Sequence, residues 1–450
     1  MTVKQKNPRF VAVEILNRVE AEGAFAENLI DYHISSSTFP HHSDKNLLTR
    51  IVYGVLQKQG NLDWIISNLY HGNFITMELG VKNILRCAIY QMEFMERVPS
   101  FAVCNDAVII AKEIASPASG LVNAICRNYL RKRDSLEYPP VDEDFFLWAQ
   151  ATLSHSQWLI EEFVALYGKE ETIKLCQANN EIPPVFLRVN GLLCSREELM
   201  KKLADEGVIC QATETSVDGL KIVSAQTVLR DTKSFREGLF ILQDEASQLI
   251  SSLVAPNNGE DIIDICAGSG VKTTHLSAKM NNSGNIVAMD ISENKLWQLS
   301  ALCKKMGVKN VKTICADAKL LSGHELKGKF DKALLDAPCS GVGTLRRNPE
   351  IKWRLQKKHL DEFAKTQGEL IMQAGEFLKR GGTLFYVTCS LFSQENEQIV
   401  GSFLEENRDF KLVTLNRGNM NNEFIENGFF KSLPHRTQTD GFFCACLRKN

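Results

Sequence analysis

The sequence lacks the features that mark membrane-spanning and zinc-binding proteins. No apolar run approaches the roughly 18–20 residues that cross a bilayer, and the polar start MTVKQKNPRF does not resemble a signal peptide. The 13 cysteines include no CxxC pair with zinc-finger spacing; they are odd in number and lie in apolar segments. We therefore expect reduced thiols in a cytoplasmic protein, with no bound metal and no membrane contact.

The chain also lacks an excess of either charge. Its 52 Lys and Arg are balanced by 54 Asp and Glu, which leaves a formal net charge of −2. Any binding of nucleic acid must therefore depend on local basic patches. A hydrophobic content of 44% and a charged content of 24% are ordinary for a globular protein, and 450 residues suggest two or three domains.

Two N-terminal segments differ in their apolar periodicity. Residues 1–138 carry apolar side chains at helical spacing, as in NPRFVAVEILNRVE, and predict an all-helical domain. The stretch DSLEYPPVDED, with two adjacent prolines, predicts a linker. Residues 145–240 combine helical stretches with the strand-like runs PPVFLRVN and GLKIVS, and predict a small α+β module. Inside it, Ser195 and Glu198 have the spacing of a capping box.

Residues 241–450 alternate between strand-like and helix-length stretches. The strand-like runs are DIIDIC (261–266), NIVAMD (285–290), NVKTIC (310–315), DKALLD (331–336) and GTLFYVT (382–388). This alternation predicts an α/β domain with a doubly wound, mostly parallel sheet. FKLVTL and GFFCACLRK predict two further strands near the end of the sequence.

The segment DICAGSGVKT (264–273) leads from a strand through a glycine loop into a helix. Gly268 and Gly270 permit close backbone approach, and the helix N-terminus presents free N–H groups to a ligand. A Walker loop requires glycine where Val271 stands, and a dinucleotide fingerprint requires glycine where Thr273 stands. A methyltransferase loop needs only the two glycines and an acidic residue at the end of the next strand.

Carboxylates follow three successive strands of this predicted sheet. Asp290 is placed for ribose hydroxyls, Asp317 for an adenine amino group, and Asp336 ends the fourth strand. Each one alone is typical of a helix cap or a turn. Together they favour a site for S-adenosylmethionine.

Two cysteines follow neighbouring strands in the same local pattern, in LLDAPCSGVG and YVTCSLFSQENE. Because the fourth and fifth strands are adjacent in this topology, we expect Cys339 and Cys389 to face one pocket. A thiolate is the natural nucleophile for a ring that is activated by addition, whereas a free buried cysteine is usually a packing residue. The pair beside a methyl-donor loop favours the catalytic interpretation.

Four motifs resemble the Sun/Nop family of RNA cytosine-5 methyltransferases: DICAGSGVKTTH, DAPCSGVGTLRRNPEIKW, VTCSLFSQENE and LPHRTQTDGFF. FILQDEASQL resembles the segment that leads into the catalytic domain of that family. IVYGVLQ, ILRCAIYQM and LVNAICRNYLRKR are similar to the NusB-like RNA-binding domain of bacterial members that modify small-subunit ribosomal RNA. The resemblance covers nearly the whole chain and implies a Rossmann-like class I methyltransferase domain over residues 241–450.

This resemblance implies methylation of cytosine carbon 5 in 16S ribosomal RNA, with transfer RNA as the alternative substrate. We expect the enzyme to be a monomer. Cys389 corresponds to the cysteine that attacks carbon 6, and Cys339 to the cysteine implicated in product release. Asp336 is implied to contact the methionine end of the cofactor, the cytosine ring nitrogen, or both. The residues implied to bind S-adenosylmethionine are Cys266, Ala267, Gly268, Ser269, Gly270, Val271, Lys272, Asp290, Asp317 and Asp336.

The glycine loop departs from the family's usual Cys-Ala-Ala-Pro-Gly-Gly-Lys. Gly268 and Ser269 loosen the turn, and Val271 adds a side chain where the family has glycine. A catalytically degenerate RNA-binding factor for ribosome assembly is therefore the rival hypothesis. Retention of both cysteines and of the three carboxylates opposes it.

The run TLRRNPEIKWRLQKKH (344–359) interleaves Trp353 with six basic residues. It predicts phosphate contacts beside an aromatic face that stacks on a base, and a solvated helix face is the alternative. His435 and Arg436 match the last family motif and receive no role.

Overall fold

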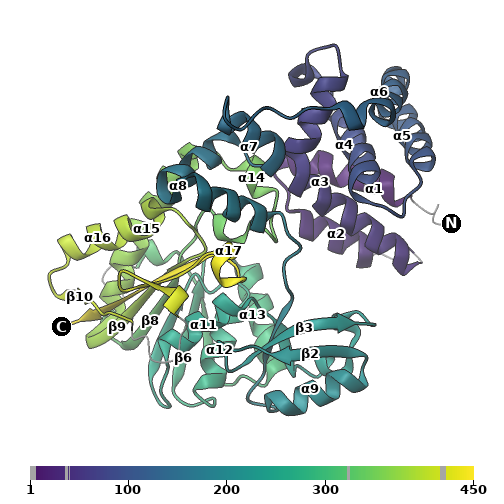
Figure 1. The fold of residues 1–450 in the computed structure, drawn as a ribbon. Helices are drawn as coiled ribbons and strands as arrows, with labels where there is room; N and C mark the ends of the chain where they lie inside the picture. The colour runs from purple at the N-terminus through teal and green to yellow at the C-terminus, as the bar shows by residue number, and fades with distance from the viewer. Residues whose placement is uncertain (1–6, 36–38, 40, 322–324, 416–421) are drawn as a thin grey trace. The chain divides into compact units, whose positions relative to one another are not determined.

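The chain divides into two compact units in the computed structural model, which describes residues 7–35, 39, 41–321, 325–415 and 422–450 (Figure 1). The helical unit comprises Met1–Ile182 and Leu345–Gln356, and the sheet unit comprises Pro183–Thr344 and Lys357–Asn450. The chain therefore leaves the sheet unit after Thr344 and returns to it at Lys357.

The helical unit confirms the prediction that the N-terminal part of the chain is all-helical. Its helices are α1 (Pro8–Glu22), α2 (Ala26–Ser35), α3 (His42–Leu69), α4 (Leu79–Phe94), α5 (Ser100–Ile114), α6 (Ser119–Lys132), α7 (Phe145–Leu153), α8 (Gln157–Asn179) and α14 (Ile351–Arg354), with 3-10 turns η1 (Phe74–Thr76), η2 (Ser116–Ala118) and η3 (Arg133–Ser135). Local chemistry sets the ends of α1: the Asn7 side chain accepts from the Arg9 N–H, Pro8 occupies the first turn, and Gly23 ends the helix at φ +67°. Buried side chains of α1 to α6 form one hydrophobic core.

The border between the units differs from the predicted linker. The stretch DSLEYPPVDED has no regular structure beyond η3, but it lies inside the helical unit. Tyr138 stacks on Trp64 with ring centroids 4.5 Å apart, and its hydroxyl accepts a hydrogen bond from Asn61 Nδ2 at 2.8 Å. Helices α7 and α8, expected in the α+β module, belong to the helical unit, because α7 packs against α3 and α8 against α7.

The sheet unit begins with a small antiparallel sheet of order β2-β3-β1-β4. Its elements are β1 (Phe186–Val189), α9 (Arg196–Asp205), β2 (Val208–Ala212), β3 (Gly219–Ala225), η4 (Leu229–Asp231), α10 (Lys233–Arg236) and β4 (Phe240–Leu242). The predicted capping box is confirmed: Ser195 Oγ accepts from the Glu198 N–H at 3.2 Å, and Glu198 Oε2 accepts from the Ser195 N–H at 2.8 Å.

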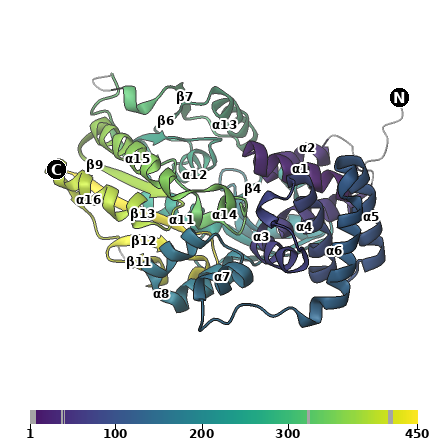
Figure 2. The ribbon, with the colours of Figure 1, turned by 90° about the horizontal axis from the view of Figure 1, so that it is seen from above.

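The large sheet has the order β11-β12-β13-β9-β8-β5-β6-β7, with β10 paired to β13. Its strands are β5 (Asp261–Ile265), β6 (Asn285–Asp290), β7 (Val311–Cys315), β8 (Phe330–Asp336), β9 (Leu378–Thr388), β10 (Phe410–Leu412), β11 (Ile425–Glu426), β12 (Phe429–Ser432) and β13 (Phe442–Lys449). In Figure 2, β7 and β6 lie at one end of this sheet and β12 and β11 at the other. The run β7-β6-β5-β8-β9 is parallel and β13 is antiparallel to β9, which confirms the predicted doubly wound, mostly parallel sheet.

Helices cover both faces of the large sheet. They are α11 (Glu245–Val254), α12 (Val271–Lys279), α13 (Glu293–Met306), α15 (Lys357–Phe377), α16 (Glu397–Glu406) and the short α17 (Pro434–Thr437), with turns η5 (Ala318–Leu320), η6 (Val342–Thr344), η7 (Ser393–Glu395) and η8 (Asn422–Phe424). Alternate residues of β5 show the two faces: Ile263 packs with α15 and α16, and Ile262 packs with α11 and α12. The carboxyl ends of the parallel strands consequently meet at one edge, where an open α/β sheet binds its ligands.

A short hairpin near the end of the chain was not predicted from the sequence. Strands β11 and β12 are joined by Asn427 at φ +52° and Gly428 at φ +86°. Asn-Gly with both residues at positive φ is the strongest short hairpin signal, and it is present in the sequence IENGFF. Within the described residues, no helix has the length and apolar content needed to cross a membrane.

Candidate active site

The loop after β5 turns sharply before α12 begins. Cys266, Gly268 and Gly270 all take positive φ, at +61°, +57° and +84°. A Cβ on Gly270 would lie 2.5 Å from Leu299 Cγ, so only glycine fits there. Val271, the departure from the family loop, is the first residue of α12 and has no positive φ, so its backbone does not need glycine.

Asp290 at the end of β6 braces this loop. Its Oδ2 accepts from the Gly268 N–H at 2.9 Å, and its Oδ1 accepts from the Ser292 N–H at 2.8 Å. The Ala267 N–H donates to the Met289 carbonyl at 2.9 Å. The loop is therefore tied to the second parallel strand at two points.

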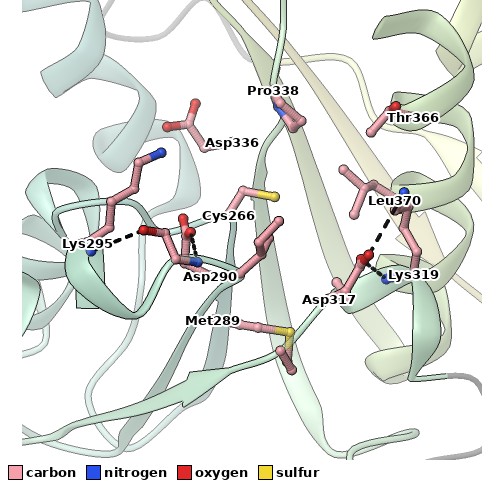
Figure 3. A pocket seen from close by; sticks show the side chains of 14 residues that line it. Cys266, Met289, Asp290, Lys295, Asp317, Lys319, Asp336, Pro338, Thr366 and Leu370 are labelled. Carbon is pink, nitrogen blue, oxygen red and sulfur yellow. Dashed lines mark hydrogen bonds and ion pairs between the residues drawn. The ribbon is translucent and has the colours of Figure 1, made fainter. Parts of the chain in front are cut away.

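A cavity of about 410 Å³ opens beside the loop (Figure 3). It is lined by Cys266, Met289, Asp290, Ile291, Ser292, Lys295, Ala316, Asp317, Ala318, Lys319, Asp336, Pro338, Thr366 and Leu370. Four of the predicted cofactor residues thus share one cavity, namely Cys266, Asp290, Asp317 and Asp336. The others, at 267–272, do not line it and act as the turn and helix start behind it.

The wall of this cavity suits S-adenosylmethionine. A volume of about 410 Å³ lies within the usual range of small-molecule sites. Carboxylates at the ends of β6, β7 and β8 offer acceptors for hydroxyls, an amino group and a sulfonium charge, while Met289 and Leu370 supply apolar surface. Thr366 and Leu370 come from α15, where no motif marked them.

A partly buried ion pair lies at the carboxyl end of β8. Lys272 Nζ is 2.6 Å from Asp336 Oδ2, and the ammonium lies 5.2 Å from the centre of the Phe442 ring. Burial disfavours the charged ammonium, yet the charge of Asp336 and its hydrogen bond outweigh burial and raise the pKa of Lys272. Behind the pair, burial raises the pKa of Asp264 to about 7, although its Oδ2 accepts from Thr273 Oγ1 at 2.6 Å.

The structure brings Cys339 and Cys389 together. Their strands are parallel neighbours, and the two Sγ atoms lie 3.3 Å apart as free thiols. The Cys389 N–H also donates to Cys339 Sγ at 3.3 Å. The contact with Cys389 and burial raise the pKa of Cys339 well above its ordinary value. The two cysteines therefore lie side by side as the strand order predicts, but neither lines the cavity described above, so the expectation that they face one pocket stays a prediction.

Two further features hold the cysteine loops, and the sequence analysis assigned neither. The fully buried Glu395 side chain accepts hydrogen bonds from both loops. Gly343 donates its N–H to the Cys389 carbonyl at 2.8 Å, and its own carbonyl accepts from the Gly441 N–H at 2.7 Å. A Cβ on Gly343 would lie 2.0 Å from the Gly441 oxygen, which explains glycine in two of the motifs. Glu395 and Gly343 both belong to motifs that resemble the family, and this membership is the only sequence signal for their role in holding the loops.

The predicted RNA contacts of the basic run are wrong for Arg346 and Lys352, which are buried in the helical unit. Lys352 is 0% exposed and donates to the Gln57 carbonyl and to Asn180 Oδ1, each at 2.8 Å. Trp353 Nε1 donates to the Leu56 carbonyl at 2.7 Å. Arg346 is also buried and forms a 3.0 Å ion pair with Glu181. Burial lowers the pKa of Lys352, and no carboxylate accepts from its Nζ among the described contacts.

His435 and Arg436 lie on the short α17, outside the cavity lining. Arg436 Nη1 lies 3.9 Å from Glu426 Oε2. Within the described residues, no cluster of three His, Cys, Asp or Glu side chains has the arrangement of a metal site.

Three family models match successive parts of the chain. Residues 6–131 match the NusB family, residues 155–229 match the RsmF/B-like ferredoxin-like domain, and residues 251–448 match the 16S rRNA methyltransferase RsmB/F. The probable ribosomal RNA small subunit methyltransferase B of Bacillus subtilis is 30% identical, over 99% of this chain and 100% of its own length. The ribosomal RNA small subunit methyltransferase B of Escherichia coli is 31% identical over 99% of both chains.

The chain belongs to the RsmB/F methyltransferase family. Among solved structures, PH0851 covers 99% of the chain at 29% identity with a TM-score of 0.82. NSun6 from Pyrococcus horikoshii, solved with SFG, covers 65% of the chain at 27% identity with a TM-score of 0.58. The predicted resemblance and fold are confirmed, and S-adenosylmethionine is the cofactor of this RsmB/F methyltransferase.

Proposed function

We propose that this RsmB/F methyltransferase transfers the methyl group of S-adenosylmethionine to carbon 5 of a cytosine in 16S ribosomal RNA. The observation that carries the proposal is the pair of thiols, 3.3 Å apart, at the ends of the strands next to the cofactor cavity. Carbon 5 of cytosine is not nucleophilic until a nucleophile adds to carbon 6, and a thiolate is suited to that addition.

In the proposed reaction, Cys389 adds to carbon 6 as a thiolate. Addition places electron density on carbon 5. Carbon 5 then forms a bond to the methyl group while the bond from that methyl group to the sulfonium sulfur of S-adenosylmethionine breaks. A general base then removes the proton on carbon 5, the bond between carbon 6 and the Cys389 sulfur breaks, and Cys389 leaves as the thiolate. The cofactor supplies the electrophilic methyl group. The target base must be unpaired or flipped out to reach the thiol.

Asp336 and Lys272 form the polar wall of this site. Asp336 lines the cofactor cavity and stands three residues before Cys339, which supports a role for its carboxylate between the cofactor and the target cytosine. The 2.6 Å ion pair with Lys272 fixes the direction of that carboxylate. We assign Asp336 to the methionine end of the cofactor, to the cytosine ring nitrogen, or to both. Cys339, in contact with the attacking sulfur, serves in release of the product.

The substrate assignment rests on the relatives and on the N-terminal domain. The relatives from Bacillus subtilis and Escherichia coli carry small-subunit ribosomal RNA in their names. The match of residues 6–131 to the NusB family supports RNA binding by the domain predicted over 1–138. The match of residues 155–229 to a ferredoxin-like domain supports a second module within 145–240, before the catalytic domain at 241–450.

The rival function, a degenerate assembly factor, rests on the altered glycine loop. Val271 takes helical backbone and Gly270 keeps its positive φ, so the altered loop still forms a closed turn beside the cavity. This observation favours a competent cofactor site.

The test combines cofactor binding with methyl transfer by the full chain. Calorimetry should show binding of S-adenosylmethionine, and no binding at millimolar cofactor would favour the degenerate factor. Protein-free 16S ribosomal RNA and transfer RNA are then supplied separately with labelled cofactor. We expect 5-methylcytosine in the ribosomal RNA, and bisulfite mapping of RNA from cells with and without the protein locates it. Methylation of transfer RNA alone would overturn the substrate assignment.

A further inference from the structure

A buried carboxylate joins the two cysteine loops of the sheet unit. Glu395, the last residue of η7, is 0% exposed. Its Oε1 accepts from the Ser340 N–H at 2.8 Å and from Gln367 Nε2 at 3.0 Å. Its Oε2 accepts from the Ser340 hydroxyl at 2.5 Å and from the Ser390 hydroxyl. A buried carboxylate needs such donors, and each of these four donors belongs to a neutral group.

The donors flank the two cysteines. Ser340 follows Cys339, Ser390 follows Cys389, and the two serine hydroxyl oxygens lie 3.1 Å apart. Gln367, on α15, also donates to the carbonyl of the residue before Cys339, at 2.9 Å. The Ser340 N–H and both serine hydroxyls donate to the same carboxylate, so Glu395 links the residues that follow the two cysteines.

The charge of Glu395 acts on the Cys339 thiol. After the contact with Cys389 and burial, the charge of Glu395 further raises the pKa of Cys339. After burial and Asp336, the charge of Cys389 contributes to the raised pKa of Lys272. Another ionisable neighbour is Tyr386, whose hydroxyl donates to the main-chain oxygen of Glu395 at 2.6 Å.

We propose that Glu395 is a positioning residue that holds the two sulfurs in register and keeps the proton on Cys339, so that Cys389 carries the thiolate. The proposal rests on the proposed function and assigns to one side chain the division of labour between the cysteines. Glu395 does not line the cofactor cavity, so it acts on the reaction through the two cysteines and their loops, without contact with the cofactor.

The first test measures the thiols without RNA or cofactor. The full chain is treated with limiting iodoacetamide, and peptide mass spectrometry gives the alkylation rates of Cys339 and Cys389 separately. We expect Cys389 to react at least about tenfold faster than Cys339, because the thiolate is the reactive form. Glu395→Gln should reduce that ratio to about threefold or less, since it removes the charge and alters the acceptor for both hydroxyls. An unchanged ratio in a folded Glu395→Gln protein would overturn the proposal.

Matched variants separate positioning from a loss of folding. Glu405→Gln, at an exposed site on α16, should leave the ratio as in the unmodified chain. Glu395→Asp keeps the negative charge on a shorter side chain. We expect its ratio of Cys389 to Cys339 alkylation rates to lie between those of Glu395→Gln and the unmodified chain. Ser390→Ala removes one donor and keeps the carboxylate, so the ratio should fall less than in Glu395→Gln. If Glu395→Gln does not fold, the Ser390→Ala and Glu395→Asp ratios decide, and two unchanged ratios contradict the proposal.

The second test measures methyl transfer. In Glu395→Gln, kcat should fall about 10–100-fold while KM for S-adenosylmethionine changes less than about threefold, because only the thiols are displaced. A rise in KM at unchanged kcat would contradict the assignment. If the unmodified chain does not methylate cytosine, the proposed function fails, whereas the alkylation ratio still reports on Glu395. The two failures are therefore distinguishable.

Discussion

The run DAPCSGVGTLRRNPEIKW divides between two different environments. Its first half, through Thr344, lies in the sheet unit, where Gly343 and the Cys339 sulfur contact the Cys389 loop. Its second half, from Leu345, lies in the helical unit, where Lys352 and Trp353 donate to backbone carbonyls. Adjacent residues of one motif therefore lie at the proposed catalytic site in one half and in helix packing in the other. We expect burial, rather than residue type, to distinguish a cation that binds RNA from one that packs between helices.

The largest expected effect concerns the first half of the run. Cys389→Ala should lower methylation by about 10⁴-fold or more, because no other group replaces the attacking sulfur. Cys339→Ala should keep the attack and slow product release, so that a covalent protein–RNA adduct accumulates. Denaturing gel electrophoresis with labelled RNA separates the two results. An adduct with Cys389→Ala and none with Cys339→Ala would exchange the two roles.

A smaller effect is expected in the second half, on stability rather than activity. Lys352→Met leaves the Gln57 carbonyl and Asn180 Oδ1 without their buried donor, which costs about 1–3 kcal/mol of unfolding free energy at high pH. Burial lowers the pKa of Lys352 from 10.5 in the folded state, so below pH 10.5 the unfolded chain binds more protons. Stability of the unmodified chain should therefore rise with pH in that window.

The Met variant should lack that contribution, and the stability gap between the two proteins should shrink as the pH falls. Urea unfolding between about pH 6 and 10 measures both curves. Parallel curves, together with a weakened affinity of the Met variant for RNA, would indicate that Lys352 contacts RNA and would contradict its assignment to helix packing.

The sequence could predict those parts of the site that follow from strand topology. Cys339 and Cys389 end neighbouring parallel strands, so their meeting follows from the α/β pattern alone. Glu395 and Leu370 could not be placed in the same way, because they reach the site from a 3-10 turn and a helix, and their contacts depend on packing. The burial of Lys352 likewise depends on α3 and α8, segments that lie about 300 and 170 residues earlier in the chain. Periodicity carries no information on such pairings.

The smallest effect is expected at Lys358, six residues beyond Lys352 in the same basic run. Lys358 is exposed in the first turn of α15, on the sheet unit. Lys358→Met should change unfolding free energy by less than about 0.5 kcal/mol, because the side chain is in solvent. If this lysine contacts a phosphate, affinity for 16S ribosomal RNA should fall about threefold, and the salt dependence should weaken by close to one counterion. Filter binding at several salt concentrations measures both quantities, with Lys352→Met as the matched control. Equal losses of RNA affinity in the two variants would show that burial does not separate the roles of these lysines.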